Sequence, residues 1–127
     1  LDLLIIGGST VRTDRPTLDS RFIQDGKACD IGIFSKHKEF DQTIPLFQVP
    51  NRKVIISDDI HKFDLRFSMV EGGFSLLDSL QNEIEYLMLF VSYKQSGELH
   101  FNPLHYGFKK VYSYFLNATD EIRFYSK

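Results

Sequence analysis

Two stretches of this chain place a glycine pair directly after an apolar run, beside side chains suited to binding phosphate. In the first, the run Leu3–Ile6 leads into Gly7 and Gly8, two hydroxyl residues, and a segment with an aspartate, a proline and arginines at 12, 15 and 21. Glycine lets the backbone approach a ligand closely or adopt a positive φ, and guanidinium groups suit phosphate. Because open α/β sheets bind ligands at the carboxyl ends of strands, this segment predicts a binding site. The alternative is a plain turn, since glycine-rich motifs often match by chance.

The second stretch is an apolar run over 67–71 that ends in Gly72-Gly73 and continues into a predicted helix. Leu76, Leu77, Leu80 and Ile84 form an apolar stripe at helical spacing. Ser75 with Asp78 three residues later predicts an N-terminal cap. A helix N-terminus presents unpaired N–H groups and favours an anion such as a pyrophosphate. An ordinary strand–turn–helix unit explains the same residues equally well.

Patterns of apolar and β-branched residues predict the elements that must position these stretches. We expect strands over 2–7, 29–35, 53–57, 67–71 and 85–93, and one long helix over 74–83. Residues 108–116 and 120–126 predict a β-hairpin with its turn at Asn117-Ala118-Thr119-Asp120. The segment after the first glycine pair, which holds Arg12, Arg15 and Arg21, is interpreted as a loop, and residues 35–52 as a loop with one short helical turn. The pattern is typical of an α/β fold.

Composition excludes several classes of function. At 127 residues with 43% hydrophobic content, the chain predicts one domain with its own core. A net charge of −2 gives no electrostatic case for nucleic acid or an anionic membrane surface, and no apolar run approaches the roughly 20 residues of a membrane span. The single cysteine, Cys29, cannot form an internal disulfide, which favours the cytoplasm. The four histidines lack metal-ligand spacing, so we expect no metal site.

The first stretch resembles the reductase domain of the bifunctional riboflavin-biosynthesis deaminase/reductase, a relative of dihydrofolate reductase. That family's pattern is an Asp, an apolar strand, a Gly, then Thr-Val-x-x-Asp-x-Pro-x-Leu-x-x-Arg; this chain has Asp2, Gly8, Thr10, Val11, Asp14, Pro16, Leu18 and Arg21. Val-Glu-Gly-Gly at 70–73 is similar to the family's second signature. The resemblance implies a dihydrofolate reductase-like three-layer α/β sandwich with a mixed, mostly parallel sheet and a C-terminal β-hairpin.

The resemblance also implies an activity and a set of site residues. The activity is NADPH-dependent reduction of 5-amino-6-(5-phosphoribosylamino)uracil to the ribityl form. Thr10 and Asp14 would contact NADPH, Glu71 would hydrogen-bond the substrate, and the Leu18 backbone and the Arg21 guanidinium would hold the sugar phosphate. Further cofactor contacts would come from Gly73, Phe74, Ser75 and Leu76. No residue is assigned as catalytic, because the cofactor carries the hydride.

The segment 50–58 is similar to the cofactor-binding strand of dihydrofolate reductases. Ser57 would help to hold the adenosine half of NADPH, with Arg52 or Lys53 near the 2′-phosphate. The alternative for these basic residues is a solvent-exposed position beside an ordinary strand.

The chain also departs from the family pattern. The family has a full helix where this chain has only residues 58–66, and residues 94–105 differ from the family's substrate-side loop. We expect 1–127 to be a single reductase-like domain without the family's first strand and helix, because in the family these elements precede the strand that corresponds to the one after Asp2; a deaminase domain commonly precedes them. Since the first residue is Leu rather than Met, we expect the chain to begin inside a longer protein. The resemblance also implies a homodimer, formed through a sheet edge or the C-terminal hairpin. The alternatives are a non-catalytic dihydrofolate reductase-like binding or dimerisation module, and a related enzyme acting on another pterin or pyrimidine.

Overall fold

The computed structural model describes residues 3–18, 28–65, 68–71, 74–93 and 102–127. The chain divides into two compact units, Leu1–Leu76 and Leu77–Lys127, which we call the N-terminal and the C-terminal unit. Within the described residues, no helix is long and apolar enough to cross a membrane. Asp2, Arg21, Gly72 and Gly73, which the sequence analysis singled out, lie outside the described residues.

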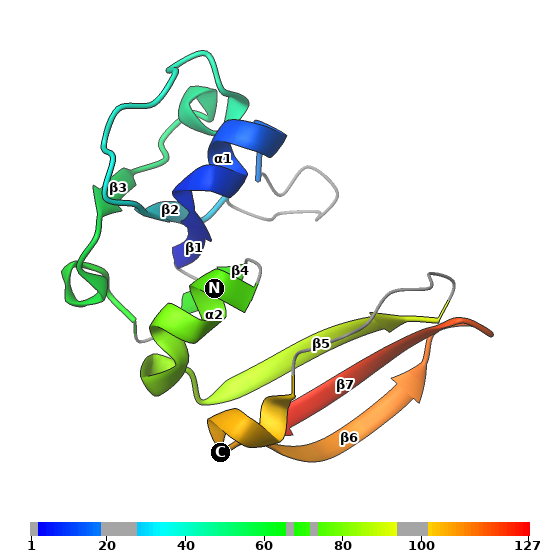
Figure 1. The fold of residues 1–127 in the computed structure, drawn as a ribbon. Coiled ribbons are helices and arrows are strands. Elements are labelled where there is room, and N and C mark those ends of the chain that lie inside the picture. The colour runs from blue at the N-terminus through cyan, green and yellow to red at the C-terminus, as the bar shows by residue number, and fades with distance from the viewer. Residues whose placement is uncertain (1–2, 19–27, 66–67, 72–73, 94–101) are drawn as a thin grey trace. The chain divides into compact units, whose positions relative to one another are not determined.

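The N-terminal unit is built on a parallel sheet of four strands in the order β3-β2-β1-β4 (Figure 1). The strands are β1 (Leu3–Gly7), β2 (Asp30–Phe34), β3 (Val54–Ser57) and β4 (Ser68–Glu71). Each confirms a predicted strand to within one residue at either end. Parallel strands that are covered on both faces carry continuous apolar runs, and the side chains of Leu3–Ile6 are all buried.

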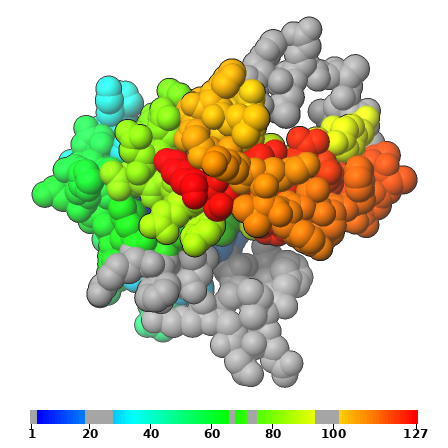
Figure 2. All heavy atoms as spheres, turned by 90° about the horizontal axis from the view of Figure 1, so that it is seen from below, coloured from blue at the N-terminus to red at the C-terminus, as the bar shows by residue number. Residues whose placement is uncertain are grey.

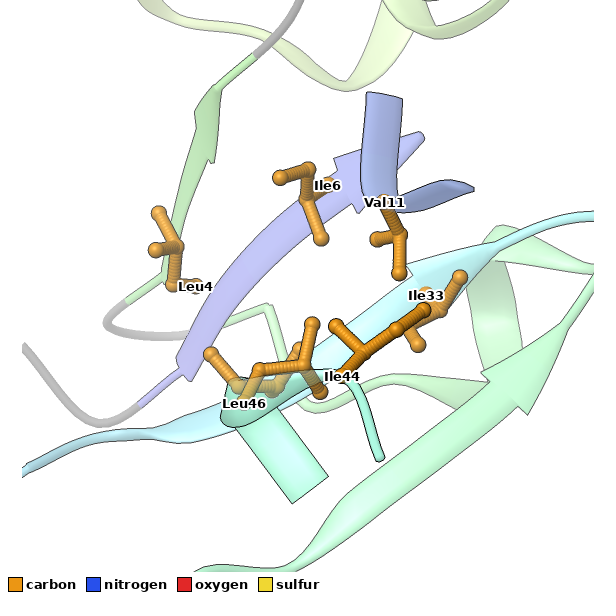
Figure 3. Close-up of a cluster of buried hydrophobic side chains, with 7 residues drawn as sticks. Leu4, Ile6, Val11, Ile33, Ile44 and Leu46 are labelled. Carbon is orange, nitrogen blue, oxygen red and sulfur yellow. The ribbon is translucent and has the colours of Figure 1, made fainter. Parts of the chain in front are cut away.

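The core of the N-terminal unit lies on both faces of this sheet. On one face, Leu4 and Ile6 of β1 pack with Ile31 and Ile33 of β2 and with Val11, Ile44 and Leu46 (Figure 3). On the other face, Leu3 and Ile5 pack with Phe63. The face therefore alternates along β1, as the period of two in a strand requires.

The segment after β1 is where the structure overturns the predicted loop. Residues Gly8–Asp14 form a helix, α1, directly after the strand. Val11 is fully buried within the core cluster and anchors this helix to the sheet. Its β-branched residues have modest helix propensity, so tertiary packing decides the conformation. The remaining N-terminal helical elements are short: η1 (Pro45–Gln48), the predicted turn within 35–52, and η2 (Ile60–Lys62), which is the only helical element among the described residues of 58–66.

The C-terminal unit contains an antiparallel sheet in the order β5-β7-β6. The boundary between the two units falls within helix α2 (Phe74–Leu80). Helix α2 and η3 (Gln81–Glu83) together span the predicted helix and lead into β5 (Tyr86–Ser92). After η4 (Pro103–Tyr106), β6 (Lys109–Phe115) and β7 (Asp120–Ser126) form the predicted hairpin. The α/β class, the parallel sheet and the C-terminal hairpin of the predicted fold are thus confirmed.

Aromatic side chains cover one face of the antiparallel sheet. The register aligns Met88 and Tyr112 with Phe124, and Phe90 and Tyr114 with Ile122. The rings of Tyr112 and Tyr114 lie 6.1 and 6.3 Å from the Phe124 ring. Phe90 is 65% and Tyr112 58% exposed, and Figure 2 shows side chains of β6 and β7 at the surface. We call Met88, Phe90, Tyr112, Tyr114 and Phe124 the aromatic face.

Candidate functional site

The order of the parallel strands locates the candidate site. From β1 the chain adds β2 and β3 on one side of the sheet, then crosses back to add β4 on the other side of β1. Such a reversal opens a crevice at the carboxyl ends of the two strands that flank it, where open α/β sheets bind ligands. Here those strands are β1 and β4, and each runs into one of the two glycine pairs. The fold therefore directs the two predicted stretches to one edge of the sheet.

Strand register sets which face of the sheet each side chain occupies. Glu71, the last residue of β4, is paired with Ile6 of β1, and Ile6 shares its face with Val11 of α1. Because paired residues of adjacent strands point to the same face, Glu71 projects on the face that carries α1. The Glu71 side chain is exposed, and no described residue hydrogen-bonds its carboxylate. Glu71 and helix α1 therefore lie on the same face of the sheet, as residues of one shared site must.

The two glycines at the end of β1 differ in whether the structure could accept a side chain there. A Cβ at Gly8 would lie 2.6 Å from the Oγ and 2.7 Å from the Cβ of Ser35, the residue after β2. The start of α1 can approach the end of β2 only because Gly8 has no side chain. A Cβ at Gly7 would meet only the Leu76 Cδ2, at an ordinary 3.8 Å. Gly7 has φ −73°, so this position does not use the positive φ that glycine permits.

Helix α1 places two of the predicted cofactor residues on one surface. Thr10 and Asp14 are four residues apart, and residues at this spacing lie on the same face of a helix with Cβ atoms about 5–6 Å apart. Asp14 is exposed and Thr10 half-buried, and neither side chain has a hydrogen-bond partner among the described residues. A hydroxyl and a carboxylate that remain unpaired can accept hydrogen bonds from ribose hydroxyls or an amide.

Two of the three arginines expected to bind phosphate are instead engaged by residues 37–43. Arg12 Nη2 donates to the carbonyls of His37 and Glu39, both at 3.1 Å, and its guanidinium lies 4.0 Å from the centre of the Phe40 ring. Arg15 Nη2 donates to Asp41 Oδ2 and to Thr43 Oγ1, both at 3.0 Å. These contacts fasten α1 to the segment after β2.

Asp41 carries the clearest electrostatic effect at this edge of the unit. Hydrogen bonds from the Thr43 hydroxyl and amide, and then the one from Arg15, lower the pKa of Asp41 from 3.8 to about 2. Each of these hydrogen bonds favours the charged carboxylate over the acid. Asp41 is therefore ionised at neutral pH and keeps Arg15 paired.

The Leu18 backbone, predicted to hold a sugar phosphate, has an uncommon conformation. Leu18 has φ +56°, and its side chain packs against the core cluster. Its carbonyl accepts a hydrogen bond from Arg52 Nη2. Arg52 therefore does not have the solvent-exposed position that was the alternative for this residue. Its guanidinium is part-buried among backbone carbonyls.

Among the predicted site residues that the structure describes, Ser57 lies farthest from the carboxyl ends of β1 and β4. It ends β3, two strands from β1, which corresponds to about 10 Å. Register aligns Ser57 with Phe34, and Phe34 with Gly7, so it projects on the face opposite Glu71. Ser57 is 7% exposed, and its Oγ accepts a hydrogen bond from the Asp59 amide at 3.0 Å. A role in holding an adenosine remains a prediction.

The predicted cap of the second helix is wrong. Because α2 begins at Phe74, Ser75 lies inside the first turn rather than at the N-cap. Asp78 accepts a hydrogen bond from the Tyr106 hydroxyl at 3.0 Å, which raises the pKa of Tyr106. Leu76 is half-buried and directed toward Gly7. No group of metal-ligating side chains occurs in the part of the chain that the structure describes.

Three structural features of the site escaped sequence reasoning: α1, the Gly8–Ser35 contact and the Arg52 guanidinium. Helix α1 had only a weak sequence signal, because Thr10 and Asp14 are four residues apart but the segment contains adjacent glycines and β-branched residues of modest helix propensity. The Gly8–Ser35 contact had no sequence signal, because any strand end could have supplied the close neighbour. Arg52 had none either, because its partners are backbone carbonyls, which every residue possesses.

Comparisons with known proteins support the fold. No protein-family profile matches the chain, and no curated protein matches its sequence. Among solved structures, it is similar to a diaminohydroxyphosphoribosylaminopyrimidine deaminase/5-amino-6-(5-phosphoribosylamino)uracil reductase from Thermotoga maritima, with 17% identity and a TM-score of 0.74. That match covers 98% of this chain and 45% of the other, so this chain spans less than half of that protein's length.

Two further solved structures are similar at lower scores. Dihydrofolate reductase from Enterococcus faecalis, complexed with NADP(H) and RAB-propyl, has 10% identity and a TM-score of 0.61, with 98% of this chain and 73% of the other covered. A structure named as that of a riboflavin biosynthesis protein from Shewanella sp. PV-4 has 14% identity and a TM-score of 0.59, with 99% of this chain and 73% of the other covered. The chain therefore has the dihydrofolate reductase-like fold.

Proposed function

We propose that this chain is an NADPH-dependent reductase domain of riboflavin biosynthesis, which reduces 5-amino-6-(5-phosphoribosylamino)uracil to 5-amino-6-(5-phosphoribitylamino)uracil. One observation carries the proposal: the strand reversal directs both glycine-pair stretches to the carboxyl edge of β1 and β4. The structural neighbour from Thermotoga maritima is named as a deaminase and a reductase acting on such compounds. Its similarity to this chain supports the fold, and the motif residues support the reaction.

The groups available at this edge fit a nicotinamide cofactor. Thr10 and Asp14 lie on one face of α1, and no described residue hydrogen-bonds to the side chain of either. Leu76, near Gly7, offers an apolar contact surface. When bound, NADPH would supply the hydride, and the protein would bind and orient the two reactants. Gly73, Phe74, Ser75 and Ser57 complete the proposed cofactor contacts.

The proposed substrate site uses residues on both sides of the crevice. Glu71, exposed at the end of β4, would accept hydrogen bonds from the amino or ring N–H groups of the pyrimidine. The Leu18 backbone and Arg21 would hold the sugar phosphate. Because hydride transfer requires the reacting atoms to be held about 3–3.5 Å apart, anchoring both ends of the substrate would fix the sugar carbonyl carbon against the cofactor.

Cofactor binding is the first test. Titration of the purified chain with NADPH and, in parallel, with NADH should show saturable binding that favours NADPH. Thr10→Ala should weaken NADPH binding about 3- to 10-fold, the loss of one neutral hydrogen bond. Asp14→Ala should weaken it about 10- to 100-fold, because hydrogen bonds to charged groups are stronger.

Thr13→Ala is the matched control, since Thr13 is an exposed threonine of the same helix and is not part of the proposed site. Its affinity for NADPH should stay within about 2-fold of the unmodified chain. Equal losses in all three variants would show that damage to α1, rather than lost contacts, weakens binding. Absence of binding to either nucleotide would contradict the proposal for this chain.

A non-catalytic binding or dimerisation module of the same fold is the alternative. The engagement of Arg12 and Arg15 by residues 37–43 favours it, because it removes two of the three cations expected to serve phosphate. Turnover of the pyrimidine distinguishes the two. In the enzyme, Arg21→Lys should raise KM for the phosphorylated substrate much more than KM for NADPH, whereas a module would show no turnover.

We also propose that the protein forms a homodimer in the cytoplasm through the aromatic face. Large exposed apolar patches mark interaction sites, and β5 and β6 are the outer strands of their sheet. Sedimentation velocity should show a concentration-dependent dimer that the double variant Phe90→Ser/Tyr114→Ser loses. A dimer that persists in this variant would place the interface elsewhere. As part of the proposed function in riboflavin biosynthesis, we also propose that a deaminase domain precedes this domain in the full-length protein.

A further inference from the structure

Arg52 joins three separate segments of the N-terminal unit through backbone carbonyls. Its Nη1 donates to the Thr17 carbonyl at 2.7 Å, and its Nη2 donates to the Leu18 carbonyl. Its Nε donates to the Cys29 carbonyl at 2.9 Å, just before β2, and Nη1 makes a longer contact of 3.4 Å with the Leu46 carbonyl. The planar guanidinium carries five donors in a fixed geometry, so it fixes the orientation of the Thr17 and Leu18 carbonyls relative to the sheet.

The Thr17–Leu18 segment that Arg52 binds has a backbone conformation that is unfavourable without contacts to the rest of the unit. A positive φ of 56° at Leu18 brings the Cβ close to the following carbonyl oxygen, so this conformation is unfavourable for a leucine. Such conformations persist where the surroundings determine them, and they cluster at ligand-binding sites. At Leu18 the surroundings are the core cluster on the side chain and Arg52 on the carbonyl.

The orientation of the Thr17 carbonyl also fixes a backbone donor. In a trans peptide the C=O and the following N–H point in opposite directions, and the structure has no cis peptide among its described residues. Because the Thr17 carbonyl points to Arg52, the Leu18 N–H points away from it. No described residue accepts a hydrogen bond from this N–H. A cation bound to the carbonyl polarises the peptide and makes its N–H a stronger donor.

We propose that Arg52 is a positioning residue for phosphate recognition: it holds the Thr17–Leu18 peptide so that the Leu18 N–H faces the phosphate of a sugar-phosphate substrate. This inference rests on the proposed function, in which the Leu18 backbone holds that group. Arg52 does not touch the phosphate. It acts from the opposite side of the peptide, through the carbonyls to which it donates.

The test compares binding of ribose 5-phosphate, ribose and NADPH to the unmodified chain and to Arg52→Lys and Arg52→Met. In ¹⁵N NMR spectra, the Leu18 amide of the unmodified chain should shift saturably with ribose 5-phosphate and stay in place with ribose. Arg52→Lys keeps the positive charge but removes the planar guanidinium with its several donors. The Kd for ribose 5-phosphate should therefore rise about 10-fold, which corresponds to the loss of one positioned, charge-assisted contact. The Kd for NADPH should stay within about 2-fold, which also reports that the variant is folded.

Arg123→Lys is the matched control in the C-terminal unit, where Arg123 likewise uses two guanidinium nitrogens, on Glu121 and Tyr93. It should change neither Kd. A purely structural role for Arg52 would weaken ribose 5-phosphate and NADPH binding in parallel, and this result would overturn the inference. An unchanged Kd for ribose 5-phosphate in Arg52→Lys would also overturn it. Should Arg52→Met not fold, Arg52→Lys decides.

The outcomes separate this inference from the proposed function. NADPH binding without any response of the Leu18 amide to ribose 5-phosphate would overturn the role of Arg52 and leave the reductase proposal standing. A phosphate response that Arg52→Lys weakens, in a chain that binds neither nucleotide, would support the inference and contradict the reductase. With the active protein, the ratio of kcat/KM for the phosphorylated and dephosphorylated substrates should fall about 10-fold in Arg52→Lys.

Discussion

The two units of this chain use their apolar residues in opposite ways. In the N-terminal unit the central strand β1 is buried on both faces, and every predicted site residue belongs to this unit. In the C-terminal unit β5 alternates between exposed and half-buried residues, and the aromatic face remains at the surface. A parallel sheet needs cover on both faces, whereas an antiparallel sheet can leave one face open. Rigid strand ends can therefore present ligand-binding groups in the first unit, while the second offers a surface for association.

The contrast in burial predicts the largest difference between the units. Ile33→Ala empties a fully buried position in β2 and should lower the free energy of unfolding by about 2–5 kcal/mol. Val111→Ala also shortens a β-branched side chain in a strand, but Val111 is 67% exposed, so the loss should stay within about 0.5 kcal/mol. Urea denaturation measures both. Similar losses would mean that the face containing Val111 is buried in solution.

The glycine pair after β1 tests how closely the N-terminal unit is packed at its candidate site. Gly8→Ala places a Cβ against the backbone-proximal atoms of Ser35 and should cost about 1–3 kcal/mol, despite the better helix propensity of alanine. Gly7→Ala meets only an ordinary contact, and its backbone conformation suits any residue, so stability should be unchanged or rise by about 0.4–1 kcal/mol. Thermal unfolding of the pair gives the comparison. Ser35→Gly should restore stability to Gly8→Ala, and failure to do so would assign the cost to another contact.

Low pH should destabilise the two units through different carboxylates. These losses in the free energy of unfolding are the smallest of the expected effects. In the C-terminal unit, Glu121 accepts hydrogen bonds from Arg123 Nε at 2.6 Å and from the Tyr93 hydroxyl at 3.0 Å. The Arg123 contact first, and then Tyr93, lowers the pKa of Glu121 below its ordinary value of 4.5. Since the folded-state pKa is the lower one, this stabilisation is complete above about pH 4.5 and is lost as the pH falls through the lowered pKa.

The counterpart in the N-terminal unit is Asp41, whose window lies lower, between 3.8 and about 2. Urea midpoints measured through these two ranges should fall with pH, first by the Glu121 contribution and then by that of Asp41. Glu121→Gln should remove the first part and Asp41→Asn the second. The Asp41 effect should be the smaller, because its pair with Arg15 is half exposed. An unchanged pH profile in Glu121→Gln would contradict the role of the Arg123 contact.

Much of the fold followed from sequence patterns. Apolar runs bounded by glycine, proline and polar residues predicted each of the seven strands that the described residues form, and an apolar stripe predicted the helical span 74–83. These signals are local, and each is repeated over several residues. The segment 8–14 escaped, because its β-branched residues and adjacent glycines carry no strong helix signal. Burial of Val11 and the close fit of Gly8 to Ser35 decide that helix.

The candidate site divides in the same way. The sequence by itself determined which residue types are available: two glycine pairs after strands, Thr10 and Asp14 one helical turn apart, and Glu71 at a strand end. Only the tertiary structure decided which of them meet, because strand order and register depend on contacts between distant segments. It engaged Arg12 and Arg15 with residues 37–43. It also turned Arg52 toward the carbonyls of Thr17 and Leu18, since a guanidinium removed from water must find acceptors, and only the folded chain determines which carbonyls lie within its reach.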